Sequence, residues 1–232
     1  TEIYVGTSYG SSTTINGKSV KTATGKTGDV YYYIPDNHES LLIYGNKNVN
    51  ASNSPLRIHN SKMINSTFVD NETGASYAVE SYNSSVTNSI IVGTKFAKSF
   101  QSHLNLSGIN TFLYSMIEGG VAGEGNITGS KRFAAFANPE KGDYSLSEKS
   151  YCINRGKDVE DSIDLLGKTR KQNGAVDMGA VESQYETADV PSLGKIIYVK
   201  ENSNGDGSSW TSAFGDISEA IKIAACDGKK HQ

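Results

Sequence analysis

Residues 60–114 read NSKMINSTFVDNETGASYAVESYNSSVTNSIIVGTKFAKSFQSHLNLSGINTFLY, and this stretch decides the fold. Asn65 and Asn88 are 23 positions apart, and Asn110 follows 22 positions later. Each Asn-Ser or Asn-Thr pair in the stretch opens a short apolar or β-branched run, which is followed by a Gly- or Asn-containing turn. A strand-and-turn unit that recurs with a period in the low twenties indicates a solenoid.

Two solenoid classes have to be distinguished at this period. Leucine-rich repeats need a ladder of Leu, and Leu is sparse in this stretch. A parallel β-helix needs β-branched and aromatic residues that point inward and Asn, Gly or Ser at its corners, which the stretch supplies. The pattern therefore predicts an all-β chain that folds as a parallel β-helix.

Stacking of successive coils gives a second prediction. Coils lie about 4.8 Å apart, so like residues lie over like residues. We expect one apolar column in the core and one Asn ladder at a corner, where side-chain amides satisfy backbone groups rather than bind a ligand. The predicted column consists of Phe68, Ile91 and Leu113, and the predicted ladder consists of Asn65, Asn88 and Asn110.

Composition excludes several classes of protein. The 232 residues include 22 basic and 25 acidic side chains, for a net charge of −3. A near-neutral chain without a basic stripe is not expected to bind nucleic acid. No apolar stretch approaches the roughly 20 residues that cross a bilayer. Apolar residues make up only 36% of the chain, which suits a solenoid because each coil buries a thin inner column.

The two cysteines, Cys152 and Cys226, lie far apart in the sequence. We interpret them as buried or half-buried thiols rather than as a disulfide. They are too few to form a cysteine metal site. Cysteine usage therefore does not identify the compartment in which the protein works.

A dense set of motifs follows the repeats. It comprises RFAAFANPEKGDYSL at 132–146, YCINRG at 151–156, IDLLGKTR at 163–170 and VDMGAVE at 176–182. This run resembles the closing region of bacterial pectate-lyase-like surface proteins, which are right-handed parallel β-helices with a choice-of-anchor Q type C-terminal region. The chain departs from that pattern at Tyr151, where Pro is usual, and at Cys152, where Ala is common.

A polar segment and a second motif complete the chain. Residues 184–195 have the composition of a linker, and residues 196–217 resemble the opening of a second β-helix of the same family, in which a G-x-G-S-S-W loop leads into a short capping helix. Helical spacing of Ile217, Ala220, Ile221 and Ala224 also predicts that helix. The predicted domains are the C-terminal part of a parallel β-helix at 1–183, the linker, and an incomplete N-terminal cap at 196–232.

Candidate site residues are few. An enzyme on such a fold would need carboxylates for Ca²⁺ and a basic residue for proton abstraction on one coil face. The candidates are His59, Asp70, Glu72, Glu80, Lys95, Lys98 and His103. None of them shows catalytic spacing, so we interpret them as solvated surface charge and assign no catalytic, cofactor-binding or metal-binding residue.

Six tyrosines could instead offer rings to sugars. In a solenoid, aromatic rings more often fill the core or cover a coil edge, and we favour that role here. The residues concerned are Tyr31, Tyr32, Tyr33, Tyr44, Tyr77 and Tyr82. A separate motif, Asp161-Ser162-Ile163, resembles the acceptor of bacterial surface O-glycosylation, which makes Ser162 a candidate acceptor.

Two functions are compatible with the sequence. We favour a non-catalytic module of a larger protein, an adhesin, stalk or scaffold that contacts glycan or protein in the extracellular space or at a bacterial cell surface, in association with the outer membrane. The alternative is a polysaccharide lyase or glycoside hydrolase that acts on extracellular polysaccharide, and it rests on fold analogy. No cofactor is expected, apart from Ca²⁺ under this alternative.

Overall fold

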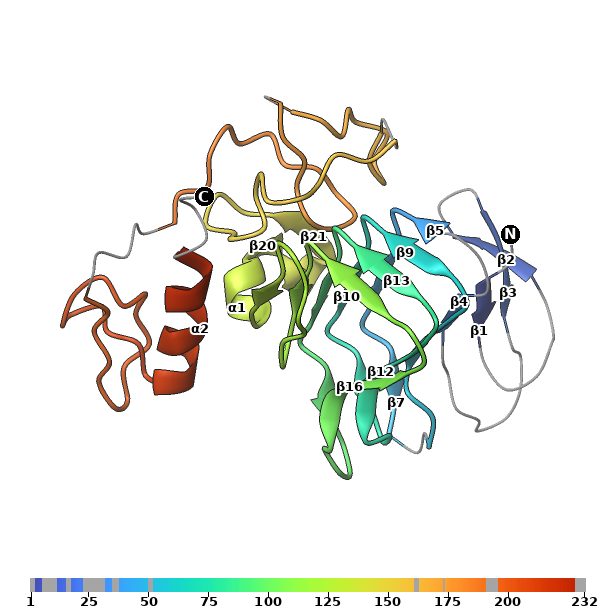
Figure 1. The fold of residues 1–232 in the computed structure, drawn as a ribbon, viewed down its shortest axis with the longest axis horizontal. Coiled ribbons are helices and arrows are strands. Elements are labelled where there is room, and N and C mark those ends of the chain that lie inside the picture. The colour runs from blue at the N-terminus through green and yellow to red at the C-terminus, as the bar shows by residue number, and fades with distance from the viewer. Residues whose placement is uncertain are drawn as a thin grey trace.

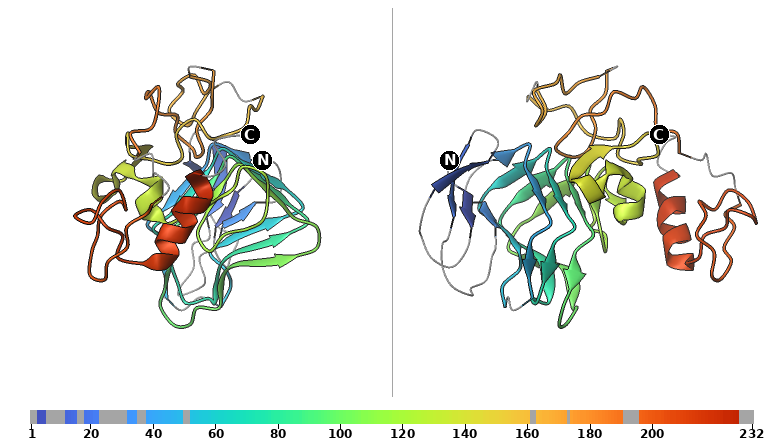
Figure 2. Two further views of the ribbon diagram at one scale, coloured as in Figure 1. Left: turned by 60° about the vertical axis from the view of Figure 1, so that its left-hand side comes forward. Right: turned by 180° about the vertical axis from the view of Figure 1, so that it is seen from behind.

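The computed structural model describes residues 3–5, 12–15, 18–22, 32–34, 38–49, 52–160, 163–172, 174–190 and 196–227. These residues form a parallel β-solenoid of about three turns with little helix (Figure 1). One view in Figure 2 looks nearly along the solenoid, so that successive coils overlie one another. The predicted all-β parallel solenoid is confirmed.

Each turn contributes strands to separate sheets. The first, which we call the long sheet, has the order β16 (Ser102–Ser107), β12 (Tyr77–Tyr82), β8 (Leu56–His59), β4 (Tyr32–Ile34), β1 (Ile3–Val5), β3 (Lys18–Thr22) and β2 (Ser12–Ile15). The second, which we call the covered sheet, has the order β19 (Ile127–Thr128), β18 (Met116–Ile117), β14 (Ile90–Val92), β10 (Thr67–Val69) and β6 (Leu42–Tyr44).

Two smaller sheets complete the coils. One has the order β17 (Thr111–Leu113), β13 (Ser85–Thr87), β9 (Lys62–Ile64) and β5 (His38–Glu39), and the other has β15 (Lys95–Phe96), β11 (Glu72–Thr73) and β7 (Lys47–Asn48). Neighbouring strands in both are parallel. The long sheet is also parallel from β4 to β16, whereas β1 pairs with β4 and β2 pairs with β3 in the antiparallel sense.

Asparagines form the corners because they tolerate the left-handed backbone conformation that a sharp turn requires. Asn60, Asn65, Asn83 and Asn88 all have φ between 47° and 51°. The side chains also connect the coils, since Asn88 Nδ2 donates to Asn65 Oδ1 at 3.0 Å. The regular spacing of Asn in the sequence therefore marks backbone geometry.

The apolar column differs from the prediction at its third member. Phe68 pairs with Ile91, and Ile91 pairs with Ile117. Leu113 lies in β17 of a different sheet, where it pairs with Thr87, so its place in the column was predicted wrongly. The four side chains Phe68, Ile91, Ile117 and Ile43 of β6 are buried in one core cluster.

The Asn ladder is also wrong at its third member. Tyr114, with φ of 48°, forms the corner next to Asn88, whose N–H donates to the carbonyl of Leu113. Asn110 lies at another corner, where its Oδ1 accepts from the Ser84 N–H. The third coil is longer, because paired residues are 23 positions apart between β10 and β14 but 26 apart between β14 and β18.

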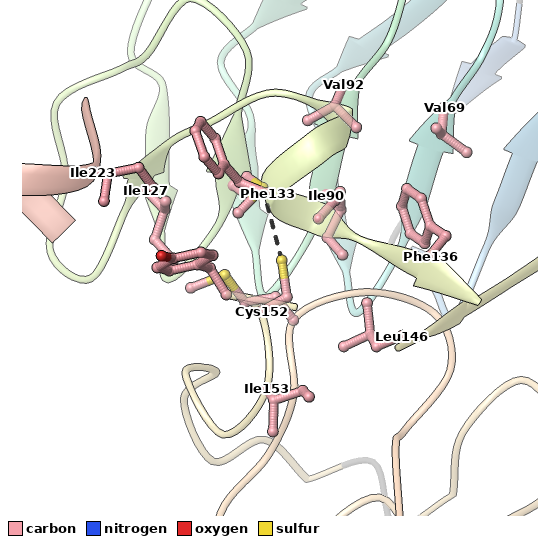
Figure 3. Close-up of a cluster of buried hydrophobic side chains, with 14 of the residues drawn as sticks. Val69, Ile90, Val92, Ile127, Phe133, Phe136, Leu146, Cys152, Ile153 and Ile223 are labelled. Atoms are coloured by element: carbon pink, nitrogen blue, oxygen red, sulfur yellow. Dashed lines mark hydrogen bonds between the residues drawn. The ribbon is translucent and has the colours of Figure 1, made fainter. Parts of the chain in front are cut away.

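The strands β10 and β14 of the covered sheet are buried on both faces. Every residue of β10 and β14 is buried, which explains their continuous apolar runs. The inner face meets the solenoid core, and the outer face meets a layer built from α1 (Lys131–Ala134), β20 (Phe136–Asn138), the 3₁₀ helix η1 (Pro139–Lys141) and β21 (Asp143–Leu146). Figure 3 shows Phe136 and Leu146 beside Val69 and Ile90 in this outer cluster.

Helix α2 (Ile217–Asp227) lies beyond α1 at the end of the solenoid opposite the N-terminus (Figure 1). Its Ala220 and Ile223 are buried in the same cluster as Ile127 of β19, whereas Ile217 and Ile221 are exposed. The helix predicted from spacing is therefore present. Its role as the cap of a following solenoid, and the predicted domain limits, stay predictions.

Cys152 is a buried free thiol, as predicted, with Sγ 3.8 Å from Met116 Sδ (Figure 3). The side chain of Cys226 and the whole of Ser162 fall outside the described residues. Among the residues that the structure describes, no helix has the length and apolar character needed to cross a membrane.

Candidate functional site

Polar side chains gather on the outer face of the long sheet. In β8, the buried Leu56 and Ile58 alternate with the half-buried Arg57 and His59, as the two-residue period of a strand requires. The next coil places Glu80 directly over Arg57 and Tyr82 directly over His59. Charged and aromatic groups that lie 23 residues apart in sequence are thus neighbours in space.

Glu80 is the centre of this cluster. Its Oε1 accepts from Arg57 Nη2 at 2.7 Å and from Arg57 Nε at 3.2 Å, and His59 Nε2 lies 3.1 Å from the same oxygen. Its other oxygen, Oε2, has no partner among the described residues. All three side chains are about one quarter exposed, so Oε2 can accept a hydrogen bond from a bound molecule.

The cluster keeps Glu80 ionised. Partial burial acts to raise the pKa of Glu80, but the hydrogen bonds from Arg57 and His59 and the positive charge of Arg57 outweigh it and hold the pKa below its ordinary value. A carboxyl group in this state accepts hydrogen bonds at neutral pH and has no proton to donate. Its chemistry suits binding and opposes a role as general acid.

An exposed ring adjoins the carboxylate. Tyr82 is 41% exposed and packs edge-on against His59, with ring centroids 6.1 Å apart. The following strand β16 continues the face with Asn105 beside Glu80 and Ser107 beside Tyr82. We call the outward side chains of Arg57, His59, Glu80, Tyr82, Asn105 and Ser107 the Glu80 face. It presents donors, acceptors and one ring over three successive coils.

The sequence predicted some of these residues and missed others. His59, Glu80 and Tyr82 were candidates, although we expected solvated charge and a ring that covers an edge. Arg57 was missed, but its position 23 residues before Glu80, one repeat period, is a signal that could have found it.

The remaining candidates lie elsewhere. Asp70 accepts from Tyr144 Oη at 2.8 Å and from Lys131 Nζ at 2.5 Å, which ties the outer layer to the solenoid. Glu72 forms an ion pair with Lys47 at 3.0 Å and lies beside Lys95 of the next coil.

The last two candidates are also separate from the Glu80 face. Lys98 is exposed on the loop after β15. The ring of His103 packs against Phe96 and Phe100. None of the candidates other than His59 contacts Glu80 in the described residues.

A buried polar cluster, missed in the sequence, holds the loops that follow β21. Arg170 is fully buried, and its Nη1 lies 3.5 Å from Glu182 Oε2. The same guanidinium donates to the carbonyls of Gly179 and Ala180 and to Ser40 Oγ on the solenoid. This cluster joins the outer layer to the coils beneath it and is closed to ligands.

Two further buried carboxyl groups, those of Asp177 and Asp164, lie close to Glu182. Glu182 Oε1 accepts from the Asp177 N–H at 2.9 Å, and Asp164 Oδ2 accepts from the Glu182 N–H at 2.9 Å. Burial raises the pKa of Glu182 to about 8, and the negative charge of Asp177 adds to this increase, against the opposing effect of Arg170. Burial raises the pKa of Asp177 as well.

We expect stability to fall as the pH rises because of Glu182. Its folded-state pKa lies above the ordinary value, so the stabilisation is complete below that ordinary value and is lost as the pH rises through about 8. Between pH 5 and pH 8 the loss should be about 3 kcal/mol. Urea unfolding at a series of pH values measures it, and Glu182→Gln should flatten the slope. Equal slopes in the two proteins would contradict the assignment.

The described residues contain no group of three or more His, Cys, Asp or Glu side chains placed to hold a metal ion. Comparison of the chain with models of protein families, with curated proteins and with solved structures gives no match.

Proposed function

We propose that this chain is a non-catalytic module that binds an extended glycan on the Glu80 face. The observation that carries the proposal is the ionised Glu80, which is held by Arg57 and His59 beside the exposed ring of Tyr82. A carboxylate oxygen accepts from sugar hydroxyls, and a tyrosine ring packs against the apolar face of a sugar.

The regularity of the solenoid supports an extended ligand. Coils follow one another at about 4.8 Å, so the Glu80 face repeats its hydrogen-bonding groups along the axis. Glu80 and Asn105 occupy equivalent places in neighbouring coils, as do Tyr82 and Ser107. A chain of similar sugar units can make similar contacts at each step.

The state of Glu80 favours binding over hydrolysis. Glycosidases use a pair of carboxyl groups, one of them with a raised pKa so that it can protonate the leaving group. Glu80 has a lowered pKa, and the residue at its place in the next coil is Asn105. The face therefore has an acceptor without an acid partner in the adjoining coil.

The resemblance of residues 132–182 to pectate-lyase-like surface proteins supports the wider setting. We propose a right-handed β-helix with a choice-of-anchor Q type closing region. We place it at the extracellular face of a bacterial cell, where it serves as an adhesin, stalk or scaffold within a larger protein. In this proposal, residues 196–227 with α2 form the cap that opens a second solenoid.

Glycan binding is tested by titrating soluble polysaccharides, neutral and acidic, into the chain by calorimetry. Tyr82→Ala should weaken binding about fivefold, since an aromatic contact contributes about 1 kcal/mol. Glu80→Gln should weaken it about tenfold, because a charged acceptor makes stronger hydrogen bonds than a neutral one. Affinity electrophoresis with the same polysaccharides provides an independent measurement.

The chain offers a matched control for each variant. Tyr185 is also 41% exposed but lies outside the Glu80 face, in the segment that follows Ser183, and Glu72 is a surface carboxylate paired with Lys47. Tyr185→Ala and Glu72→Gln should leave the affinity unchanged. The proposal fails if no polysaccharide binds, or if the control variants reduce affinity as much as Tyr82→Ala and Glu80→Gln.

The second candidate is a polysaccharide lyase, because Arg57 and His59 place basic groups beside a carboxylate on the same face. A lyase abstracts a proton from an acidic sugar and leaves an unsaturated product. Incubation with acidic polysaccharides, with and without Ca²⁺, and ultraviolet detection of unsaturated ends tests this. Product formation that is lost in Arg57→Ala or His59→Ala would replace the binding proposal with the enzymatic one.

A further inference from the structure

A cleft of about 560 Å³ lies between the outer layer and the segment that precedes α2. One wall includes Ser147, Lys149, Tyr151 and Asp189, and the other includes Asn204, Gly205, Asp206 and Ser212. Buried rings of Phe133, Tyr151 and Phe214 line its floor. The volume falls within the range of small-ligand sites, which combine an apolar floor with a few polar groups.

Arg132 joins the two walls. From α1, its guanidinium donates to the carbonyl of Asn204 at 3.1 Å and also to the carbonyl of Gly205. Its Cζ lies 5.4 Å from the centre of the Phe214 ring, at cation–π distance. These contacts fix the segment that precedes α2 against α1.

Two charged groups on the first wall are available to a ligand. Lys149 and Asp189 are exposed, and neither side chain has a hydrogen-bond or ion-pair partner among the residues that the structure describes. The Asp189 N–H donates to the Glu148 carbonyl at 2.7 Å, which fixes Asp189 beside this part of the chain. A donor and an acceptor thus lie on the same wall.

The opposite wall adds a second acceptor. Asp206 Oδ1 accepts from the N–H and hydroxyl of Ser208, at 3.0 and 2.6 Å, which orients the carboxylate. Partial burial acts to raise the pKa of Asp206, but these hydrogen bonds and the charge of Arg132 hold it below its ordinary value. Asp206 is therefore an anion at neutral pH.

The charges of the lining select the class of ligand. Two cations, Arg132 and Lys149, balance two anions, Asp189 and Asp206, so the cleft has no net preference for a charged molecule. It favours a neutral molecule that carries many donors and acceptors and has an apolar face for the ring floor. We infer that the cleft binds an uncharged mono- or disaccharide, with its hydroxyl groups between the two walls.

This site is separate from the Glu80 face. Its lining comes entirely from residues 132–214, and it shares no residue with the long sheet. The inference does not depend on the proposed function, because a polysaccharide can fail to bind the Glu80 face while a small sugar still binds the cleft.

The test is a calorimetric titration of the chain with maltose, cellobiose, lactose and N-acetylglucosamine, together with the charged sugars glucuronate and glucosamine. We expect saturable binding of at least one neutral sugar and weaker binding of both charged sugars. Asp189→Asn should weaken the neutral sugar about tenfold. The double variant Lys149→Gln/Asp189→Asn should abolish measurable binding.

Three control variants identify the site. Glu148→Gln changes an exposed carboxyl next to Lys149 that does not line the cleft, and it should leave Kd unchanged. Trp210→Ala removes an exposed ring, 65% accessible, from the same loop as Asp206 but outside the lining, and should also leave Kd unchanged. Tyr82→Ala should have no effect, because Tyr82 belongs to the Glu80 face.

Several results would overturn the inference. The first is the absence of saturable binding for every neutral sugar. The second is an affinity that is equal in wild type and in Asp189→Asn. The third is tighter binding of glucuronate or glucosamine than of any neutral sugar. Circular dichroism of each variant ensures that a lost affinity reflects the exposed side chain and not the fold.

Discussion

Replacing Arg170 with Met should destabilise the chain by about 4 kcal/mol. Removing the donor of a buried hydrogen bond leaves its acceptor unsatisfied, which typically costs about 1–3 kcal/mol for each acceptor. Here the substitution removes the donor to the carbonyls of Gly179 and Ala180 and to Ser40 Oγ, and it removes the positive charge that opposes the raised pKa of Glu182. Met retains the volume of the side-chain stem, so the loss reports on charge and hydrogen bonding.

Thermal and urea unfolding measure this loss, and we expect a fall in Tm of roughly 10 °C. Hydrogen exchange should accelerate first around Gly179 and Ala180, whose carbonyls lose their donor. The matched control is Lys171→Ala, which breaks an exposed ion pair with Asp158 in the neighbouring position. That control should cost less than about 0.5 kcal/mol. Equal effects of the two substitutions would show that the buried guanidinium of Arg170 stabilises the chain no more than the exposed ion pair of Lys171 does.

Replacing Phe68 with Ala should also cost about 4 kcal/mol. Phe68 has no exposed surface and stacks between Ile43 and Ile91 in the column that continues to Ile117. A Phe-to-Ala change in a packed core typically costs 3–5 kcal/mol, which includes the cavity it leaves. The cost should be near the upper end, since the coils on both sides hold the site open.

The free energy of unfolding in urea measures the effect of Phe68→Ala. Phe100→Ala is the matched control, because the same atoms are removed from a side chain that is 57% exposed. We expect a cost below about 1 kcal/mol for the control. A cost of Phe68→Ala no larger than that of Phe100→Ala would mean that the column of stacked side chains does not support the solenoid.

The sequence repeat predicted the architecture. Each coil contacts mainly the coils next to it, so the residue types needed at its corners and in its core recur at a regular spacing in the sequence. Asn65 and Asn88 recur at 23 residues since each corner needs a residue that tolerates positive φ. The same reasoning failed for Asn110 and Leu113. Their 22-residue offset resembles another repeat, but the third coil has 26 residues between paired strands.

The sequence motifs mark the residues of the outer layer, but they do not predict that this layer packs against the covered sheet. The continuous apolar runs of β10 and β14 indicate that both faces of these strands are covered. The residues of these strands do not identify the element that covers the outer face. The sequence motif that contains Arg170 does not indicate a role for this residue. Its contacts with Glu182 and Ser40 exist only because loops on either side of Gly174 close over the solenoid.

The sequence separation between interacting residues decides which features can be predicted from the sequence and which only the tertiary structure shows. Short-range requirements, such as strand alternation and corner asparagines, are set by neighbouring residues and can be recognised in the chain alone. Contacts between the solenoid and the layers that cover it depend on loop lengths, which carry no periodic signal. The tertiary structure alone therefore brings Arg170 to Ser40 and places Lys149, Asp189 and Asp206 around one cleft.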